Sequence, residues 1–172
     1  MNSHQITKYA QVVYHGIFDS VINIYLIRNL GLDIRSTAIS PRGYMATNSC
    51  TFYGSAVYPQ VYMAGFSVES VGKSSGWKSM ISTITKRNKS CSVQYRLGLF
   101  PLKHPEKSVC LDLVMGHSRD DPMLDILQDK ALVTGSSVHV LVDPVSRKSV
   151  RISDEWREKL EYLKPRHCSH WI

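Results

Sequence analysis

The chain has 172 residues, a formal net charge of +7 and a sequence pI of about 9.3. This length is enough to bury a core, so we expect a single domain over residues 1–172. The positive charge favours anionic partners: nucleic acid, an anionic membrane surface or a phosphate-bearing ligand. Four cysteines without a CxxC spacing, and a start without a secretory signal, argue against a disulfide-bonded secreted domain. We therefore expect free thiols and a cytoplasmic protein, with a mitochondrial location left open.

The most apolar stretch, Val12–Asp33, reads VVYHGIFDSVINIYLIRNLGLD. From Ile17 to Leu30 its apolar residues occupy every side of a helix, which predicts a helix buried nearly all round. Gly31 then marks the end, since glycine accepts the left-handed conformation found there. The run is too short and too polar to span a bilayer. Residues 1–11 show little pattern, so we expect almost no structure before this helix.

Four later stretches read as β-strands because apolar and polar residues alternate or because Thr and aromatic residues are abundant. They are Gly43–Tyr53, Val61–Val71, Ser92–Phe100 and Ala131–Val142. In the last of these, three valines face one way, while Ser137 and His139 face the other. A histidine inside a strand is most often a hydrogen-bonded residue of the sheet.

A closing helix is expected after Ser153, whose side chain can accept a hydrogen bond from the first amides. Acidic residues at 154 and 155 suit the positive end of that helix. The order of elements is therefore helix, strands, helix. It predicts an α+β domain whose sheet is largely antiparallel and wraps around the first helix.

Gly76–Cys91 is the most basic segment and contains no acidic residue. A solvated loop explains it, and so does a surface for nucleic acid or another anion. Trp77 is its single aromatic residue, whereas single-stranded nucleic acid is usually held by several stacking aromatics. Nucleic-acid binding is therefore the last of the hypotheses.

The sequence Gly72-Lys73-Ser74-Ser75 ends like a phosphate-binding P-loop. The P-loop glycine five residues earlier is replaced by Ser67, and no helix pattern follows, which disfavours nucleotide hydrolysis. A small turn rich in amides and carrying a lysine can still hold a phosphate. An ordinary turn at a strand end is the alternative.

Possible catalytic residues lie on the long helix, where His15, Asp19 and Asn23 follow at spacings of four on one side. Catalysis and a structural hydrogen-bond network both explain them. No glycine-flanked nucleophilic serine is present. The terminal His167, Cys168 and His170 lack a fourth ligand at a recognisable spacing, so we expect no metal and no cofactor.

Three blocks of sequence carry a resemblance to a known family: VVYHGIFDSVINIYLIRNLGLD, VESVGKSS and VTGSSVHVLVDPVSRKSVRISDEW. In this order they resemble the hotdog-fold acyl-CoA thioesterases of the 4-hydroxybenzoyl-CoA thioesterase type. The resemblance implies an α+β hotdog fold, a long central helix wrapped by an antiparallel sheet, with active sites at the interface of a homodimer or higher homo-oligomer. It also implies a hydrolase of lipid metabolism that splits acyl-CoA into free acid and coenzyme A. An acidic side chain, not a serine, would act, and amides at the helix start would polarise the thioester carbonyl.

The sequence departs from this family before the helix. Members carry Asp-x-Asp-x-x-Gly-His-Val-Asn-Asn there, and a gapless alignment places Lys8, Tyr9, Ala10 and Gln11 at the last four positions. The two acids would fall near Asn2 and His4. The usual catalytic acid is therefore missing, and the expectation includes a sheet without its first strand. Residues 76–91 and about 103–130 look like insertions.

The resemblance assigns provisional roles to residues of this chain. Asp19 would replace the missing acid, with His15 next in line. Some relatives have Val-Tyr-His in the active-site loop, which resembles Val13-Tyr14-His15 four residues out of register. The helix start at Tyr14–Gly16 would lie near the thioester carbonyl. The phosphates of coenzyme A would lie near Gly72, Lys73, Ser74 and Ser75. The alternative function is a catalytically inactive hotdog module that binds acyl-CoA or serves in assembly.

Overall fold

The computed structural model of this protein describes residues 3–33, 41–57, 60–72, 91–103, 127–128 and 130–165, and for residues 3–11 the backbone alone. The insertion-like segments 76–91 and 103–130 therefore lie almost entirely outside the described residues. The elements are listed in chain order: α1 Ser3–Leu30, β1 Arg42–Phe52, β2 Tyr62–Val71, β3 Ser92–Pro101, β4 Val133–Val142 and α2 Asp154–Tyr162.

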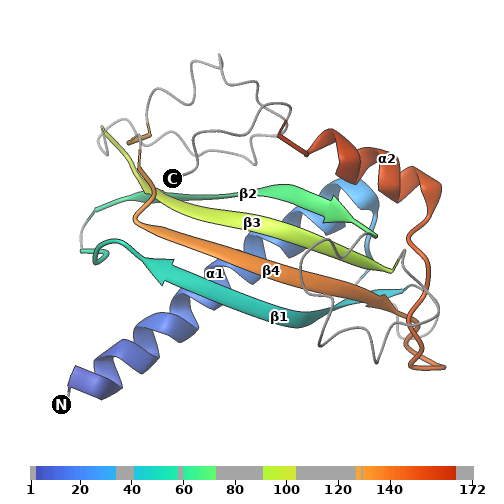
Figure 1. Ribbon diagram of the computed structural model, residues 1–172, viewed down its shortest axis with the longest axis horizontal. Helices are drawn as coiled ribbons and strands as arrows, with labels where there is room; N and C mark the ends of the chain where they lie inside the picture. The colour runs from blue at the N-terminus through green and yellow to red at the C-terminus, as the bar shows by residue number, and fades with distance from the viewer. Residues whose placement is uncertain are drawn as a thin grey trace.

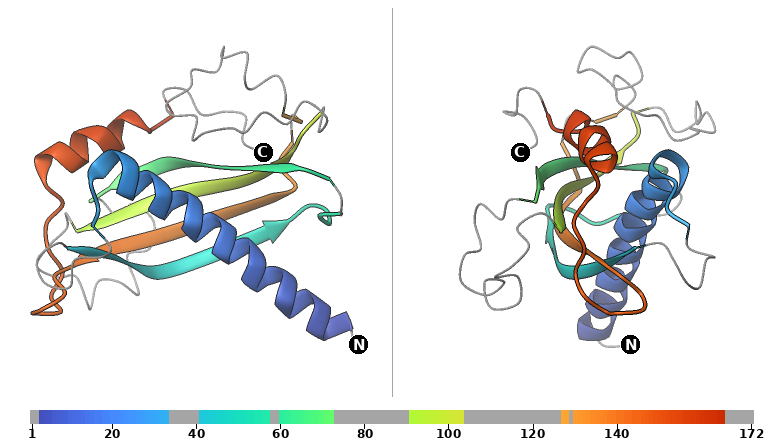
Figure 2. Two further views of the ribbon diagram at one scale, coloured as in Figure 1. Left: turned by 180° about the vertical axis from the view of Figure 1, so that it is seen from behind. Right: turned by 90° about the vertical axis from the view of Figure 1, so that its right-hand side faces the viewer.

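The four strands form one sheet in the order β1-β4-β3-β2, and each neighbouring pair is antiparallel. Helix α1 crosses one face of this sheet diagonally, and its N-terminal end projects past the sheet (Figures 1 and 2). Helix α2 lies at the end of the sheet where α1 finishes. The predicted α+β class and the antiparallel sheet packed on a long helix are confirmed.

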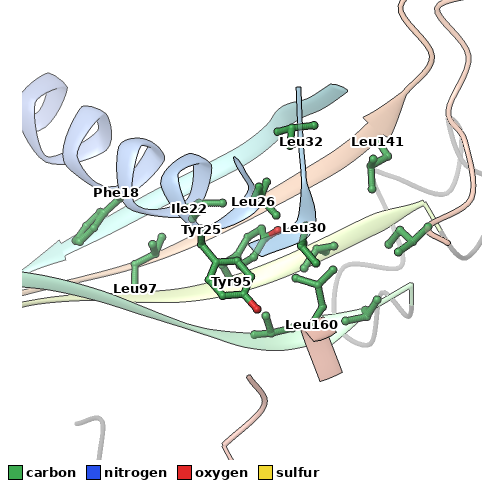
Figure 3. Close-up of a cluster of buried hydrophobic side chains, with 14 of the residues drawn as sticks. Phe18, Ile22, Tyr25, Leu26, Leu30, Leu32, Tyr95, Leu97, Leu141 and Leu160 are labelled. Carbon is green, nitrogen blue, oxygen red and sulfur yellow. The ribbon is translucent and has the colours of Figure 1, made fainter. Parts of the chain in front are cut away.

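The core lies between α1 and the sheet. Phe18, Ile22, Tyr25, Leu26 and Leu30 from the helix meet alternate residues of the strands, among them Tyr95 and Leu97 (Figure 3). The apolar residues that alternate along β3 form its inward face, because each is at most 4% exposed: Val93, Tyr95, Leu97 and Leu99. Burial of this apolar surface is the main force that holds the helix on the sheet.

Two predictions about α1 are wrong. The helix begins at Ser3, not near Val12, so structure does precede the apolar stretch. It is also not buried all round, because Ile24 and Ile27 are 39% and 36% exposed. The described sheet covers one side of the helix, and these two residues face away from it. The end is as expected: Gly31 has a φ of 66°, and the next amide, of Leu32, donates to the Leu26 carbonyl at 3.0 Å.

Helix α2 fixes the C-terminal end of α1. Ser153 caps α2, as predicted, by accepting a hydrogen bond from the Trp156 amide at 3.2 Å. Leu160 is fully buried, and the Lys159 ammonium donates to the Asn29 carbonyl at the end of α1 at 3.3 Å. A cation at that position also interacts favourably with the negative end of the α1 dipole. No helix in the described residues is long and apolar enough to cross a membrane.

Candidate functional site

Two hollows flank α1 where it crosses the sheet, and both involve the helix turns between Val13 and Asp19. Phe18 points from the helix towards the sheet (Figure 3) and lines the second of these hollows. At about 100° per residue, Val13 and Ile17 fall on one flank of the helix, while His15 and Asp19 fall on the other. We call the first space the apolar groove and the second the polar hollow.

The apolar groove has a volume of about 430 Å³. Its walls come from α1 and from β2 and β3, and include Val13, Tyr14, Ile17, Tyr62, Ala64 and Leu99. Tyr14 is held by an edge-to-face contact with Phe52, whose ring centre lies 5.3 Å away. A space of this size, lined by apolar and aromatic side chains, suits a small apolar ligand or a hydrocarbon chain.

The polar hollow lies between α1, β1 and β4, and its walls include His15, Asp19, Asn48, Ser136 and Ser137. Its volume is close to that of a single water molecule. One oxygen of Asp19 accepts a hydrogen bond from the Asn23 amide at 2.9 Å. The Asp19 side chain is 42% exposed, so it joins the hollow to solvent.

His139 lies beneath Asp19, on the face of β4 that meets α1. Its Nε2 is 3.8 Å from the other oxygen of Asp19, and its ring forms a T-shaped contact with that of Tyr95, with ring centres 5.3 Å apart. Burial lowers the pKa of His139 below its ordinary value, and the Asp19 charge opposes that shift in part. Among the described residues, neither ring nitrogen of His139 has a hydrogen-bond partner, and the Ser137 hydroxyl has none.

His15 contacts a cysteine on β1: its Nδ1 lies 3.5 Å from the sulfur of Cys50. Burial raises the pKa of the Cys50 thiol. The thiolate is the nucleophilic form of cysteine, and a raised pKa keeps this one protonated at neutral pH. The pair is therefore a thiol beside an imidazole, and Cys50 is a poor candidate for a nucleophile.

Comparison with solved structures places this arrangement among known folds. The PA5185 protein of Pseudomonas aeruginosa strain PAO1 is 26% identical, with 90% of this chain and 78% of that chain covered and a TM-score of 0.60. A thioesterase-superfamily protein from Jannaschia sp. CCS1 is 13% identical, with coverages of 87% and 68% and a TM-score of 0.56. SAV2348 of Staphylococcus aureus, solved in complex with CoA, is 9% identical, with coverages of 91% and 74% and a TM-score of 0.58.

This chain has the hotdog fold that these solved structures share. No protein-family model and no curated protein sequence matches it. The hotdog resemblance inferred from the three sequence blocks is thus confirmed at the level of the fold. The likeness to the 4-hydroxybenzoyl-CoA thioesterase type in particular stays a prediction.

Within the hotdog fold, the predicted site residues of α1 divide between the two flanks. Tyr14 lines the apolar groove, whereas His15 and Asp19 line the polar hollow. Gly16 faces outward, and a Cβ atom added there would meet nothing within 4 Å. The expected helix start at Tyr14–Gly16 is wrong, because α1 begins at Ser3. Amides in the middle of a helix donate to carbonyls four residues earlier, so they are not available to polarise a thioester.

The predicted phosphate turn is described only at its first residue. Gly72 adopts a φ of 70°, and its amide donates to the Ser92 carbonyl at 2.7 Å. This amide therefore joins the end of β2 to β3 and is not available to a phosphate. Lys73, Ser74 and Ser75 lie outside the described residues.

Sequence reasoning missed the importance of Ser137, His139 and Cys50. The β4 alternation was predicted, but the face that carries Ser137 and His139 is the one buried against α1. The sequence did carry one sign of this site: Ser137 and His139 lie two residues apart, on the same face of a strand whose other face carries three valines. In the part of the chain that the structure describes, no group of three or more His, Cys, Asp or Glu residues could hold a metal ion.

Proposed function

We propose that this protein hydrolyses an acyl-CoA thioester to a free acid and coenzyme A without a serine nucleophile. The observation that carries the proposal is the apolar groove beside Tyr14 in a hotdog fold, with an acid and a histidine one helix face away. A structural neighbour, SAV2348, was solved with CoA, which makes acyl-CoA the first substrate class to test. A role in lipid metabolism inside the cell would follow from that substrate.

In this proposal the acyl chain lies in the apolar groove and Asp19 acts on water. The Asp19 carboxylate accepts a proton from water while the water oxygen bonds to the thioester carbon. The carbon–sulfur bond then breaks, and the coenzyme A sulfur leaves with the proton. His15, also in the polar hollow, is the next candidate for proton transfer. Contacts of Lys73, Ser74 and Ser75 with the phosphates rest on the sequence argument alone.

The second candidate is a hotdog module that binds acyl-CoA, or serves in assembly, without hydrolysing it. One observation favours it: α1 separates Asp19 from the apolar groove, since the two lie on opposite flanks of the helix. A carboxylate must reach the attacking water within hydrogen-bond distance to act as a base. A groove that holds the acyl chain without such contact would bind and not react.

A homodimer or higher homo-oligomer is part of the proposal. In the described sheet, β1 is an edge strand, and Tyr44 and Phe52 on it are 51% and 40% exposed. Such an edge offers backbone groups and apolar side chains to a second strand. Pairing with a second copy would place new residues next to the α1 flank that carries Asp19. The molar mass in solution, measured by light scattering, tests this part.

The experiment measures release of the coenzyme A thiol from short-, medium- and long-chain acyl-CoA, with Asp19→Asn beside the unchanged protein. We expect turnover that falls at least tenfold, about 1.4 kcal/mol in transition-state stabilisation, in Asp19→Asn. Glu158→Gln, on an exposed face of α2, is the control and should turn over normally. If turnover survives in Asp19→Asn, another group acts as the base, and His15→Gln is the next variant to test.

A binding arm separates the two candidates. A non-hydrolysable thioether analogue of acyl-CoA is titrated against the protein and against Ala64→Trp, which fills the apolar groove. Val145→Trp, in an exposed turn, is the matched control. Binding that is lost only in Ala64→Trp, with no turnover of any substrate, identifies the inactive module. Equal binding by both tryptophan variants would contradict the groove as the acyl site.

A further inference from the structure

Two side chains on β4 are buried without the hydrogen bonds that such groups normally make. Ser137 and His139 are 2% and 4% exposed and point to the same face of the sheet, beneath α1. Among the described residues, the Ser137 hydroxyl and both His139 ring nitrogens have no hydrogen-bond partner. Buried polar atoms in folded proteins are nearly always paired with protein or with an ordered water, so these require an explanation.

The geometry around Asp19 supplies one. The carboxylate oxygen nearest His139 is 3.8 Å from Nε2, which is too long for a direct hydrogen bond. The other oxygen is already held by Asn23. The polar hollow is lined by Asp19 and Ser137 and fits about one water molecule. His139 is not one of its walls and borders it through the Asp19 carboxylate, 3.8 Å from Nε2. Two polar groups separated by more than about 3.5 Å can be joined by a bridging water molecule.

We propose that a water molecule in the polar hollow joins Asp19 to Ser137 and His139, and that His139 is the positioning residue for the Asp19 carboxylate. The proposal rests on the proposed function in one respect, since it takes Asp19 as the acid of the reaction. Ser137 and His139 hold the water from the sheet, and the water holds the carboxylate from below. The exposed side of Asp19 stays open to solvent and to substrate.

The tautomer of His139 follows from its surroundings. Nδ1 faces the backbone of β1 at Gly43, where an added Cβ atom would lie 3.7 Å away. Nε2 faces the Asp19 carboxylate, which is an acceptor. The hydrogen of the neutral ring therefore belongs on Nε2, directed at the carboxylate or its water.

Among the described residues, the titratable groups in contact around this site are Asp19 and His15 on α1, Cys50 on β1 and Tyr95 on β3. Cys50 and Tyr95 are neutral at pH 7, because burial raises the pKa of both. Asp19 is therefore the charge that the His139 ring senses most strongly, and the coupling between these two can be isolated by one substitution.

The first test is nuclear magnetic resonance of ¹⁵N-histidine-labelled protein, with the His139 signals assigned through His139→Gln. We expect a neutral ring at pH 7.5 with the proton on Nε2. In Asp19→Asn the pKa of His139 should be lower than in the unchanged protein, because the anion that favours the cationic ring is gone. An Nδ1-protonated ring, or the same titration in both proteins, would overturn the proposal. This readout does not depend on enzymatic activity.

The second test is the pH profile of thioester hydrolysis. His139→Gln should lower kcat about tenfold with KM changed less than twofold, and should move the acid limb of the kcat profile. Ser137→Ala should act in the same direction and less strongly. In the Asp19→Asn background, His139→Gln should cost nothing further, because both residues act through one group. Thermal melts check that each variant is folded. If His139→Gln does not fold, His139→Asn is used in its place.

The two proposals fail separately. Asp19→Asn that abolishes turnover, together with a His139→Gln profile like that of the unchanged protein, overturns the positioning role alone. No turnover by the folded, unchanged protein overturns the proposed hydrolysis. The nuclear magnetic resonance experiment then still decides whether Asp19 and His139 form a coupled pair.

Discussion

The two flanks of α1 are formed by the same helix turns but differ in how tightly they pack against the sheet. On the apolar flank, Val13 and Ile17 border a groove of about 430 Å³ that the described side chains leave open. On the polar flank, Asp19 closes over Ser137 and His139 and leaves a space close to that of one water molecule. Packing is loose where the residues are apolar and tight where they are polar.

This contrast is the reverse of what stability alone favours. Filling the apolar groove would bury more apolar surface, and replacing Ser137 and His139 by apolar residues would remove buried groups without direct partners. Departures from such local rules tend to mark functional sites. The contrast therefore supports the two proposals made above, ligand binding on one flank of α1 and positioning of the Asp19 carboxylate on the other.

The largest expected effect comes from the residue that holds both flanks against the sheet. Ile22 is fully buried beneath α1, and Ile22→Ala should lower the free energy of unfolding by about 2–5 kcal/mol through lost burial and a cavity. Ile24, 39% exposed on the same helix, is the matched control, and Ile24→Ala should cost under about 1 kcal/mol. Urea unfolding measures both. Equal losses would contradict the observed orientation of α1.

A smaller effect is expected at the glycine that lets α1 approach β4. A Cβ atom added to Gly135 would lie 3.0 Å from the Ser49 carbonyl oxygen and 3.2 Å from the Phe18 ring. Gly135→Ala should therefore destabilise the protein by about 1–3 kcal/mol. Gly65, in β2, has nothing within 4 Å of such an atom, so Gly65→Ala is the control and should leave the urea midpoint nearly unchanged. A neutral Gly135→Ala would mean that the helix can move away without cost.

The strands were predictable because their pattern is local. Side chains alternate along a strand with a period of two, so β2 and β3 were placed within a residue at each end. The start of α2 was found from one residue, Ser153, whose hydroxyl can cap only nearby amides. The resemblance to hotdog proteins fixed how these elements are arranged, which no local pattern could do.

The site was less predictable, because it depends on contacts between distant parts of the chain. Helix-forming residues without an apolar stripe precede Val12, so sequence periodicity gave no sign of the helix start at Ser3. Tyr14 and Asp19 line different hollows, and this separation depends on how α1 lies on the sheet. The burial of His139 depends on which face of β4 packs against α1. Because the opposite face is rich in valine, the sequence pattern did not show which of the two faces is buried.

A still smaller change in stability is expected at Asn23, which holds the outer oxygen of Asp19 at 2.9 Å. Because Asp19 is 42% exposed, water replaces much of this bond, and Asn23→Ala should cost only about 0.5–1 kcal/mol in urea unfolding. Ser20→Ala is the control, since the Ser20 hydroxyl bonds to the helix backbone at Gly16 and not to Asp19. A loss above that range would indicate that Asn23 supports more of the polar flank than one oxygen.

The smallest expected effect is a change in how stability depends on pH, and it isolates the buried imidazole. Burial lowers the pKa of His139 in the folded protein below its ordinary value of 6.5. The unfolded chain therefore binds the proton first as pH falls, so the stability that His139 contributes is complete above about pH 6.5 and declines as pH drops towards the folded pKa. His139→Gln should remove this decline and flatten the unfolding midpoint between pH 7.5 and 5.5.

Asp19→Asn should have the opposite effect on that slope. Without the nearby anion the folded pKa of His139 falls further, so stability should continue to decline to lower pH than in the unchanged protein. The measurement is the urea midpoint at several pH values for the unchanged protein and both variants, which cancels the contribution of the other histidines. If the three slopes coincide, the imidazole titrates identically in the folded and unfolded chains. The polar flank would then be hydrated like the surface, and the difference between the two flanks would be one of shape alone.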